Sequence, residues 1–492
     1  MRPGYTRIRL AAAGRPVRLL AIGASLLLVA ACTTVGPDYH LPQDAAVQRG
    51  DLQTALGSTG DGVVSAPMPA DWWRLYRDPK LDALIENALA SNTDLRVAVA
   101  NLARARAGAD EARDAGGFEH RAKAGAQRLQ ESGEAFLLPD KVPVANVADV
   151  GLSTSYQFDL FGVLARGVEA AEATADAAQA AEDVARVTLI ADVTRAYVSV
   201  CAANEELRIA QRSVDLQQQR VDLTQRLRQA GRGNETEVTR SQTRFKSLRA
   251  DLPRYAATRQ AGLYRLAMLL AVPVETLPTE IRECQHLPTI AQPLPVGNGA
   301  DLLKRRPDIR QAERQLAASV ARIGVATGEL YPDISIGASV GVVGLAENLG
   351  KPSTQRWGFG PLISWTIPSN GARARIRQAQ ASNQAALARF DGVVLNAVRE
   401  AQTSLSQYDA ALQQRAALQD AAESAEQAAQ QTHRFYQAGR ESFIEDLEAT
   451  RALTDVRAQL AAAETRVAMN QVDLFLALGG GWETEERAAS QP

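Results

Sequence analysis

The chain lacks a basic excess, and it has few aromatic residues. Its 54 Lys and Arg are balanced by 56 Asp and Glu, so the formal net charge is −2. A protein that binds nucleic acid through phosphate contacts needs a basic surface, and this balance argues against nucleic acid as a partner. Aromatic residues make up only 5% of the 492 residues, while Ala, Gln, Arg and Glu are abundant. This composition is typical of long, closely packed helices rather than of a thick hydrophobic core.

Residues of the kinds that carry catalysis or bind metals are also scarce. There are three cysteines and four widely separated histidines, too few and too scattered for a metal site. No nucleophile elbow, phosphate loop or HExxH motif occurs, so we expect no enzyme, no cofactor and no metal. Cys201 lies in a long helical pattern and Cys284 in a proline-bounded connector. We expect two isolated thiols, although an oxidising compartment would allow them to pair.

After the first 31 residues there is no apolar run long enough for a transmembrane helix. Residues 1–31 themselves join five arginines to the apolar run LLAIGASLLLVAA, the layout of a cleaved secretory signal. Cys32 follows directly, after small residues that resemble a bacterial lipoprotein processing box. We therefore predict lipidation of Cys32. The alternative is an ordinary cleaved signal with an incidental cysteine. Thr33 would be the second residue of the mature chain. In Gram-negative lipoproteins a residue other than Asp at this position favours sorting to the outer membrane.

An internal duplication is visible in the tetrapeptide QAGR. It occurs at 229–232 and again at 437–440, which is 208 positions later (437 − 229). Apolar residues match in register after it and, with a small change of offset, before it. Each copy predicts a helix, two strands, a very long helix, a tight turn and a second long helix. We divide the chain into a signal peptide (1–31), an extended N-terminal segment (32–70), a first repeat (71–290), a second repeat (291–480) and a flexible tail (481–492).

The predicted strands alternate between apolar and small polar residues. Such alternation suits a half-buried sheet in a soluble domain, but aromatic residues concentrated on the apolar face suit a membrane barrel with lipid outside and water inside. On the second interpretation five side chains face lipid: Tyr156, Phe158, Trp357, Phe359 and Trp365. Gln157, Asp159, Gly358, Gly360 and Ser364 would then face water. The first strand, near 120–129, is the weakest and is unusually charged.

Four strands are too few to close a barrel, for which about eight is the minimum. Three copies would supply twelve. The long helices point the same way, because they are too thinly apolar to fold alone and need helical neighbours on both sides. Within one of them, Pro253 predicts a kink or local bulge.

These features converge on a known family. The segments DWWRLYRDPKLDALIENALASNTDL, YQFDLFG, LLKRRPDIRQAERQLAASVARIGVA and WGFGPLISWTI make the chain resemble the outer-membrane efflux proteins (TolC-like), in their lipoprotein branch. The resemblance implies an α+β membrane protein, a homotrimer whose twelve-stranded outer-membrane β-barrel continues into a twelve-helix periplasmic α-barrel. It also implies a passive exit duct for drugs and other small toxic compounds. An RND-type inner-membrane pump would deliver them through a periplasmic adaptor.

Each QAGR is predicted to mark a helix-turn tip at the periplasmic mouth, where Gly231 and Gly439 take a left-handed cap and Arg232 and Arg440 follow. The resemblance places a periplasmic constriction at two acidic residues of the second copy, Glu445 and Glu448. For Glu445 a capping box with Ser442 is the competing explanation.

Two other classes of protein remain open at this stage. A periplasmic coiled-coil adaptor lipoprotein also combines lipidation with long helical hairpins, but it has one hairpin between soluble β domains. A purely structural coiled-coil lipoprotein would not need the amphipathic strands. We therefore favour the outer-membrane channel, anchored by lipid and extending into the periplasm.

Overall fold

The structure is a computed structural model that describes residues 34–53, 62–367 and 370–481. Its principal helices are α3 (Pro79–Ser91), α4 (Thr93–Asp114), α5 (Val163–Gln229), α6 (Glu235–Leu269), α8 (Gly299–Arg305), α9 (Pro307–Gly328), α10 (Asn370–Gln437) and α11 (Phe443–Ala477). The long strands are β2 (Phe118–Leu129), β3 (Ala145–Phe158), β5 (Asp333–Leu345) and β6 (Gln355–Ser364). Shorter elements are α2 (Gly50–Gln53), α7 (Thr279–Arg282), β1 (Val63–Val64) and β4 (Leu294–Pro295).

The chain forms two compact units, each built from segments of both predicted repeats. The first unit comprises the described residues within 1–40, 105–175 and 315–386, and the second comprises those within 41–104, 176–314 and 387–492. Among the described residues, no helix is long and apolar enough to cross a membrane.

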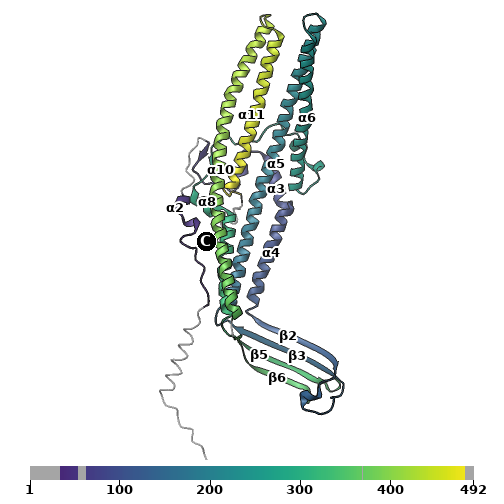
Figure 1. Ribbon diagram of the computed structural model, residues 1–492, viewed down its shortest axis with the longest axis vertical. Coiled ribbons are helices and arrows are strands. Elements are labelled where there is room, and N and C mark those ends of the chain that lie inside the picture. The colour runs from purple at the N-terminus through teal and green to yellow at the C-terminus, as the bar shows by residue number, and fades with distance from the viewer. Residues whose placement is uncertain (1–33, 54–61, 368–369, 482–492) are drawn as a thin grey trace, which may run out of the picture. The chain divides into compact units, whose positions relative to one another are not determined.

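The first unit is built around a four-stranded antiparallel sheet with the order β2-β3-β5-β6 (Figure 1). The two strands of each repeat are neighbours, and β3 joins the two pairs by running antiparallel to β5. Strand β2, although charged, is paired along its whole length with β3, from Phe118 opposite Tyr156 to Leu129 opposite Ala145. The strand predicted at 120–129 is therefore present, and it begins two residues earlier.

The second unit contains most of two helical hairpins, α5 with α6 and α10 with α11 (Figure 1). Polar side chains bridge the two helices of each hairpin. Within the first hairpin, the Gln217 amide donates to the Ser241 carbonyl at 3.0 Å. Within the second, the Asn470 amide donates to the Gln407 carbonyl at 2.9 Å. α6 passes through Pro253 as one continuous α-helix, so the bulge predicted as one possibility there is absent.

The cysteines correct a prediction. Cys201 of α5 and Cys284, just after α7, form a disulfide with their Cα atoms 4.9 Å apart, and both are buried. The expectation of two isolated thiols was wrong, because the connector after α6 folds back along α5 rather than away from it. The Asn204 amide holds it there by donating to the carbonyls of Arg282 and Cys284, at 3.1 Å each.

Removing this disulfide should destabilise the protein. The bond closes a loop that spans 83 positions and contains the whole first hairpin tip, so it restricts the unfolded chain. We expect Cys201→Ser with Cys284→Ser to lower the free energy of unfolding by about 2–4 kcal/mol. Urea unfolding with and without dithiothreitol measures this. The reductant should shift the midpoint of the parent chain and leave that of the double variant unchanged; equal midpoints for both proteins without reductant would contradict the prediction.

Candidate functional site

The sheet has one apolar face, and its register shows which residues share it. Tyr156 of β3 lies between Phe118 of β2 and Ile336 of β5, while Trp357 of β6 lies opposite Val340. Residues paired across antiparallel strands point to the same side. The face so defined includes Phe118, Val150, Leu152, Tyr156, Phe158, Ile334, Ile336, Val340, Val342, Trp357, Phe359 and Ile363. Many of these side chains are exposed; Trp357, at 83%, is the most exposed of them.

The length of this apolar band fits a bilayer. From Ala148 to Phe158 the strand advances ten residues (158 − 148), which is about 33 Å along the strand. With a strand tilt of about 40°, the band would be about 25 Å tall, the height of the apolar band on outer-membrane barrels. Arg128 lies on the same face but at the loop end of β2, where a charged side chain can reach a membrane surface.

The opposite face is mostly small and polar, although Val147, Val343, Leu345 and Leu362 also lie on it. Gln157, Gly358, Gly360 and Ser364 all have the parity of this second face. Asp159, predicted to be among them, lies beyond the end of β3, and its carboxylate instead accepts hydrogen bonds from the backbone N–H groups of Leu164 and Ala165 at 3.1 and 2.8 Å. It is a cap for the start of α5, so its assignment to the strand was wrong.

Trp365 is also outside its predicted strand. β6 ends at Ser364, and the indole Nε1 of Trp365 donates to the Leu330 carbonyl at 3.1 Å. Trp365 is 56% exposed. The position corresponds to the edge of the apolar band rather than its middle, which suits a tryptophan with one polar atom.

The two hairpin tips share one backbone geometry. Gly231 and Gly439 both have φ of 70°. The N–H groups of Arg232 and Arg440 donate back to the carbonyls of Leu227 and Phe435, at 2.8 Å in both tips. This turn, closed by backbone hydrogen bonds, is a Schellman motif. It ends a helix with a glycine in the left-handed region.

The side chains of the two tips differ at equivalent positions. Arg228 and Glu235 form an ion pair in the first tip. In the second tip these positions (436 and 443, each 208 further on) are Tyr436 and Phe443, whose ring centroids lie 5.4 Å apart. The Arg440 guanidinium lies over the nearby Phe435 ring, 5.6 Å from its centroid. One tip is therefore charged and the other aromatic.

The two predicted constriction residues lie in the first turns of α11 and have different surroundings. The Glu445 N–H donates to the Ser442 hydroxyl at 3.2 Å, which is the capping interaction. The exposed Glu448 side chain forms a 2.9 Å ion pair with Arg220 of α5. The sequence did not indicate Arg220, because 228 positions (448 − 220) separate it from its partner.

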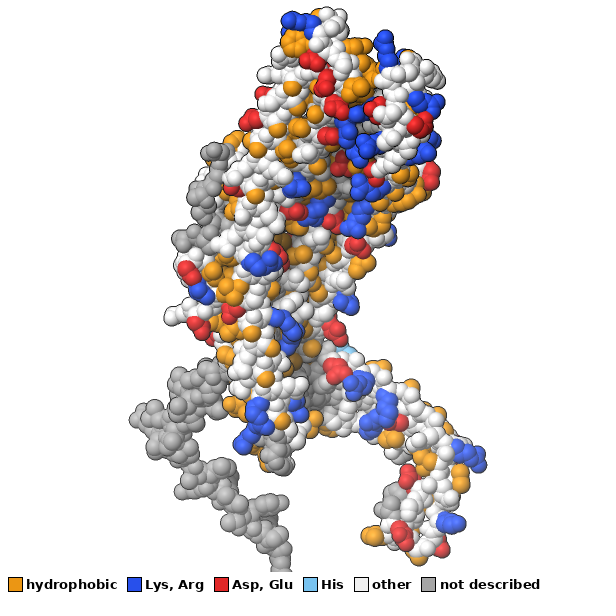
Figure 2. All heavy atoms as spheres, turned by 45° about the horizontal axis from the view of Figure 1, so that its top comes forward, with side chains coloured by type: hydrophobic (Ala, Val, Ile, Leu, Met, Phe, Trp, Pro, Cys, Tyr) orange, Lys and Arg blue, Asp and Glu red, His pale blue; other side chains and the backbone are white. Residues whose placement is uncertain are grey.

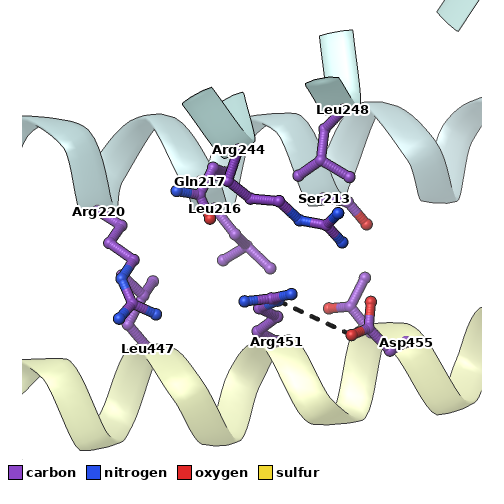
Figure 3. Close-up of a pocket in the computed structure, with 10 residues that line it drawn as sticks. Ser213, Leu216, Gln217, Arg220, Arg244, Leu248, Leu447, Arg451 and Asp455 are labelled. Carbon is purple, nitrogen blue, oxygen red and sulfur yellow. Dashed lines mark ion pairs between the residues drawn. The ribbon is translucent and has the colours of Figure 1, made fainter. Parts of the chain in front are cut away.

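A groove runs between α5, α6 and α11 next to this pair (Figure 3). Arg220, Arg244 and Arg451 line its first part, and Arg451 forms an ion pair with Asp455 at 3.8 Å. Ser213, Leu248 and Asp455 also line an adjoining cavity of about 440 Å³. α6 has more basic residues than acidic ones, as the basic side chains of Figure 2 illustrate, whereas α11 has more acidic residues than basic ones. The groove is thus lined by charges of both signs.

The segment after the predicted lipidation site is fixed against the end of the sheet. The Val35 N–H donates to the Phe161 carbonyl at 2.9 Å, and buried Arg166 donates to the Val35 carbonyl and forms an ion pair with Asp38. Gly36 has φ of 89°, and a Cβ there would lie 2.4 Å from the Cα of Gly324. This position therefore has room only for glycine. Cys32 itself lies outside the described residues.

Comparisons with known proteins agree with this geometry. The outer membrane efflux protein family matches residues 84–272 and 299–480. The chain is 29% identical to Nodulation protein T of Rhizobium leguminosarum bv. viciae, over 96% of this chain and 95% of that protein. It is 30% identical to the pyoverdine export outer membrane protein OpmQ of Pseudomonas aeruginosa, with 95% and 99% covered. The solved structure of the outer-membrane channel OprN superposes with a TM-score of 0.81 at 33% identity, covering 92% of this chain and 100% of OprN.

Proposed function

This chain belongs to the outer membrane efflux protein family, and we propose that three copies of it form a single exit duct. It is the outer-membrane channel of an efflux system, as are the channels it resembles along nearly its whole length. The finer proposal is a twelve-stranded β-barrel continuous with a twelve-helix periplasmic α-barrel. The family is one of transport ducts, and we assign the chain no catalytic role.

The two-faced sheet carries this proposal. One face carries a band of apolar side chains, many of them exposed, and the other is mostly small and polar. β2 and β6 are the edges of a four-stranded sheet, and their free backbone groups could not be left unpaired in lipid. Closure with the sheets of two further copies pairs every edge. An adaptor lipoprotein, the alternative, has no use for such a sheet.

Equal element lengths support the proposed duplication. α5 and α10 have 67 and 68 residues, and α6 and α11 have 35 each. α4 and α9 both have 22. Two equivalent hairpins per chain would give the pseudo-sixfold arrangement needed by a tube of twelve helices. We keep 71–290 and 291–480 as the two repeats, between an N-terminal segment (32–70) and a tail (481–492).

The test is the oligomeric state together with conductance. Purified protein should run as an SDS-resistant trimer that dissociates on heating and should open pores in planar lipid bilayers. A monomer that forms no pores would refute the duct and favour the adaptor alternative.

The protein resides in the outer membrane, and we propose that acylated Cys32 anchors it there. Because Val35 is fixed at the β3–α5 junction, the lipid would enter the bilayer beside the periplasmic edge of the barrel. One acyl chain gives only marginal membrane affinity, so the barrel would supply the rest.

We propose that the helix-turn tips face the partners, a periplasmic adaptor and an RND-type inner-membrane pump, which would supply drugs and other small toxic compounds. The contrast between the charged and aromatic tips supports recognition of two different partner surfaces. Basic Arg232 and Arg440 flank both tips, so acidic residues on the partner would suit either one.

Glu445 and Glu448 are proposed as the periplasmic constriction. In a trimer each would form a ring of three carboxylates that attracts cations. We expect Glu445→Ser with Glu448→Ser to lower the cation-to-anion permeability ratio about threefold at 0.1 M salt, because the double variant removes both rings of three carboxylates within about one Debye length of the pore. The reversal potential of the trimer under a salt gradient measures this ratio.

Glu441→Ser is the matched control, because Glu441 is exposed in the same tip but precedes α11. It should leave the ratio unchanged. If the double variant remains trimeric and conducts with the parent ratio, Glu445 is only a helix cap and Glu448 only the partner of Arg220.

A further inference from the structure

The polar face of the sheet carries an uneven group of charges on three strands. Asp149 of β3 accepts a hydrogen bond from Lys123 of β2 at 2.9 Å and another from Arg356 of β6 at 2.6 Å. Two cations thus share one carboxylate. These side chains are not buried: the exposed fractions are 69% for Lys123, 24% for Asp149 and 43% for Arg356.

The register aligns the two cations in one row, and Asp149 lies two residues along β3 from it. Lys123 is paired with Gly151, Gly151 with Gly341, and Gly341 with Arg356. The row therefore crosses all four strands and has a cation at each end and glycine at both positions between. It lies near the middle of β2 and β3.

The two glycines leave the sheet surface open beneath the charges. A Cβ at Gly151 would lie 3.1 Å from the Arg356 Nη2 atom, and a Cβ at Gly341 would lie 2.5 Å from the Val150 carbonyl oxygen. Side chains at these two positions would obstruct the Arg356 side chain, which reaches over β5 to Asp149. The absence of side chains at the two positions between Lys123 and Arg356 is therefore required by the way Arg356 reaches Asp149.

The remaining charges on this face do not offset the row. Glu119 and Arg121 form an ion pair with each other and cancel. Asp333 is at the start of β5, several residues from the row, and accepts from the Gln157 amide at 3.3 Å. Lys123, Asp149 and Arg356 together leave one positive charge per chain at the level of the row.

We propose that Lys123, Asp149 and Arg356 form a net-cationic ring in the barrel lumen that selects for solutes carrying carboxylate or phosphate groups. This inference rests on the proposed trimeric barrel, in which the polar face lines the lumen and the row is repeated three times. A ring of fixed charge raises the local concentration of ions of opposite sign and favours their passage. An ion pair with Asp149 would need only one cation, yet both Lys123 and Arg356 are present. The second cation, together with the two glycines between them, is what points to contact with solutes.

Reversal potentials of trimers in neutral lipid bilayers, under a KCl gradient around 0.1 M, test the ring. Lys123→Gln with Arg356→Gln changes the charge from +1 to −1 per chain, and we expect the chloride-to-potassium permeability ratio to fall about three- to tenfold. Asp149→Asn, a nearly isosteric change, should raise the ratio. Both shifts should shrink at 1 M salt, where the Debye length is about 3 Å.

Arg128→Gln is the control, because Arg128 is on the same strand but on the apolar face. It should not change the ratio. Conducting trimers in which Asp149→Asn and the double variant both keep the parent ratio would overturn the ring while leaving the duct intact. Parent protein that forms no pores would instead refute the proposed function, and the ring with it.

Discussion

Trp357→Arg is expected to abolish the heat-modifiable trimer in the outer membrane, whereas Gly358→Arg is expected to leave it in place. Trp357 is paired with Val340, which is paired with Leu152, in the middle of the apolar band. An arginine facing lipid near the midplane costs about 2–4 kcal/mol. Three copies in one barrel would multiply that cost, so the effect should exceed that of most single substitutions.

Gly358 is the matched comparison, because it is the next residue on the same strand and faces the opposite side of the sheet. A Cβ there would meet only the Ser339 hydroxyl, at 3.5 Å, so a longer side chain has room. Both variants add the same charge to β6. Unheated gel migration and urea unfolding in detergent report the result. A stable Trp357→Arg trimer beside an unstable Gly358→Arg trimer would mean that the apolar face lines the interior.

The strands could be predicted because their alternation is a local property. Residues two apart share a face, so the apolar set on β3, β5 and β6 is visible in a short window of sequence. The prediction failed at strand ends, where a cap or turn takes over: Asp159 binds the start of α5, and Trp365 follows the last residue of β6. Charged β2 was uncertain for a different reason. Glu119, Arg121, Lys123 and Gln127 face one side, but His120 and Arg128 lie on the apolar side, so the alternation of β2 is interrupted and its faces become visible only once β3 sets the register.

Contacts between segments far apart in the chain could not be predicted. The ion pair of Arg220 with Glu448 and the disulfide of Cys201 with Cys284 depend on which helices pack together. Periodicity identifies the apolar side of a helix but not its neighbour. The helix cap at Ser442, in contrast, depends on residues three apart, and its hydroxyl accepts from the Glu445 N–H as the spacing indicates.

The RRPDI segment was used only as a mark of resemblance, and the structure gives it a physical role. Arg306 precedes Pro307, which disfavours helical geometry, so α8 ends at Arg305 and Arg306 is extended with φ of −67° and ψ of 121°. Pro307 is then the first residue of α9, where it lacks only an N–H that would be unpaired anyway. The break directs the Arg306 side chain into the protein, where it is buried.

Arg306 joins three helices there. It donates to both carboxylate oxygens of Asp308 at 3.0 and 2.7 Å, to Glu400 of α10 at 2.9 Å, and to the carbonyl of Ala477, the last residue of α11, at 2.8 Å. Burial alone would lower the pKa of Arg306, but the hydrogen bonds with Asp308 and Glu400 raise it above its usual value. The Arg306 guanidinium therefore keeps its positive charge, which is balanced by the carboxylates of Asp308 and Glu400.

Arg306→Ala should be among the most destabilising substitutions in the chain. It leaves two partly buried carboxylates and one helix-end carbonyl without their donor, and breaking such a buried pair costs about 3–5 kcal/mol. Arg306→Lys should restore only part of the loss, because an ammonium cannot make the planar paired contact with Asp308. Exposed Lys304→Ala, two residues away, is the control and should change the urea midpoint little. If Arg306→Ala unfolds at the same urea concentration as Lys304→Ala, then the three helices are held by their packing alone, and the arginine serves only to end α8.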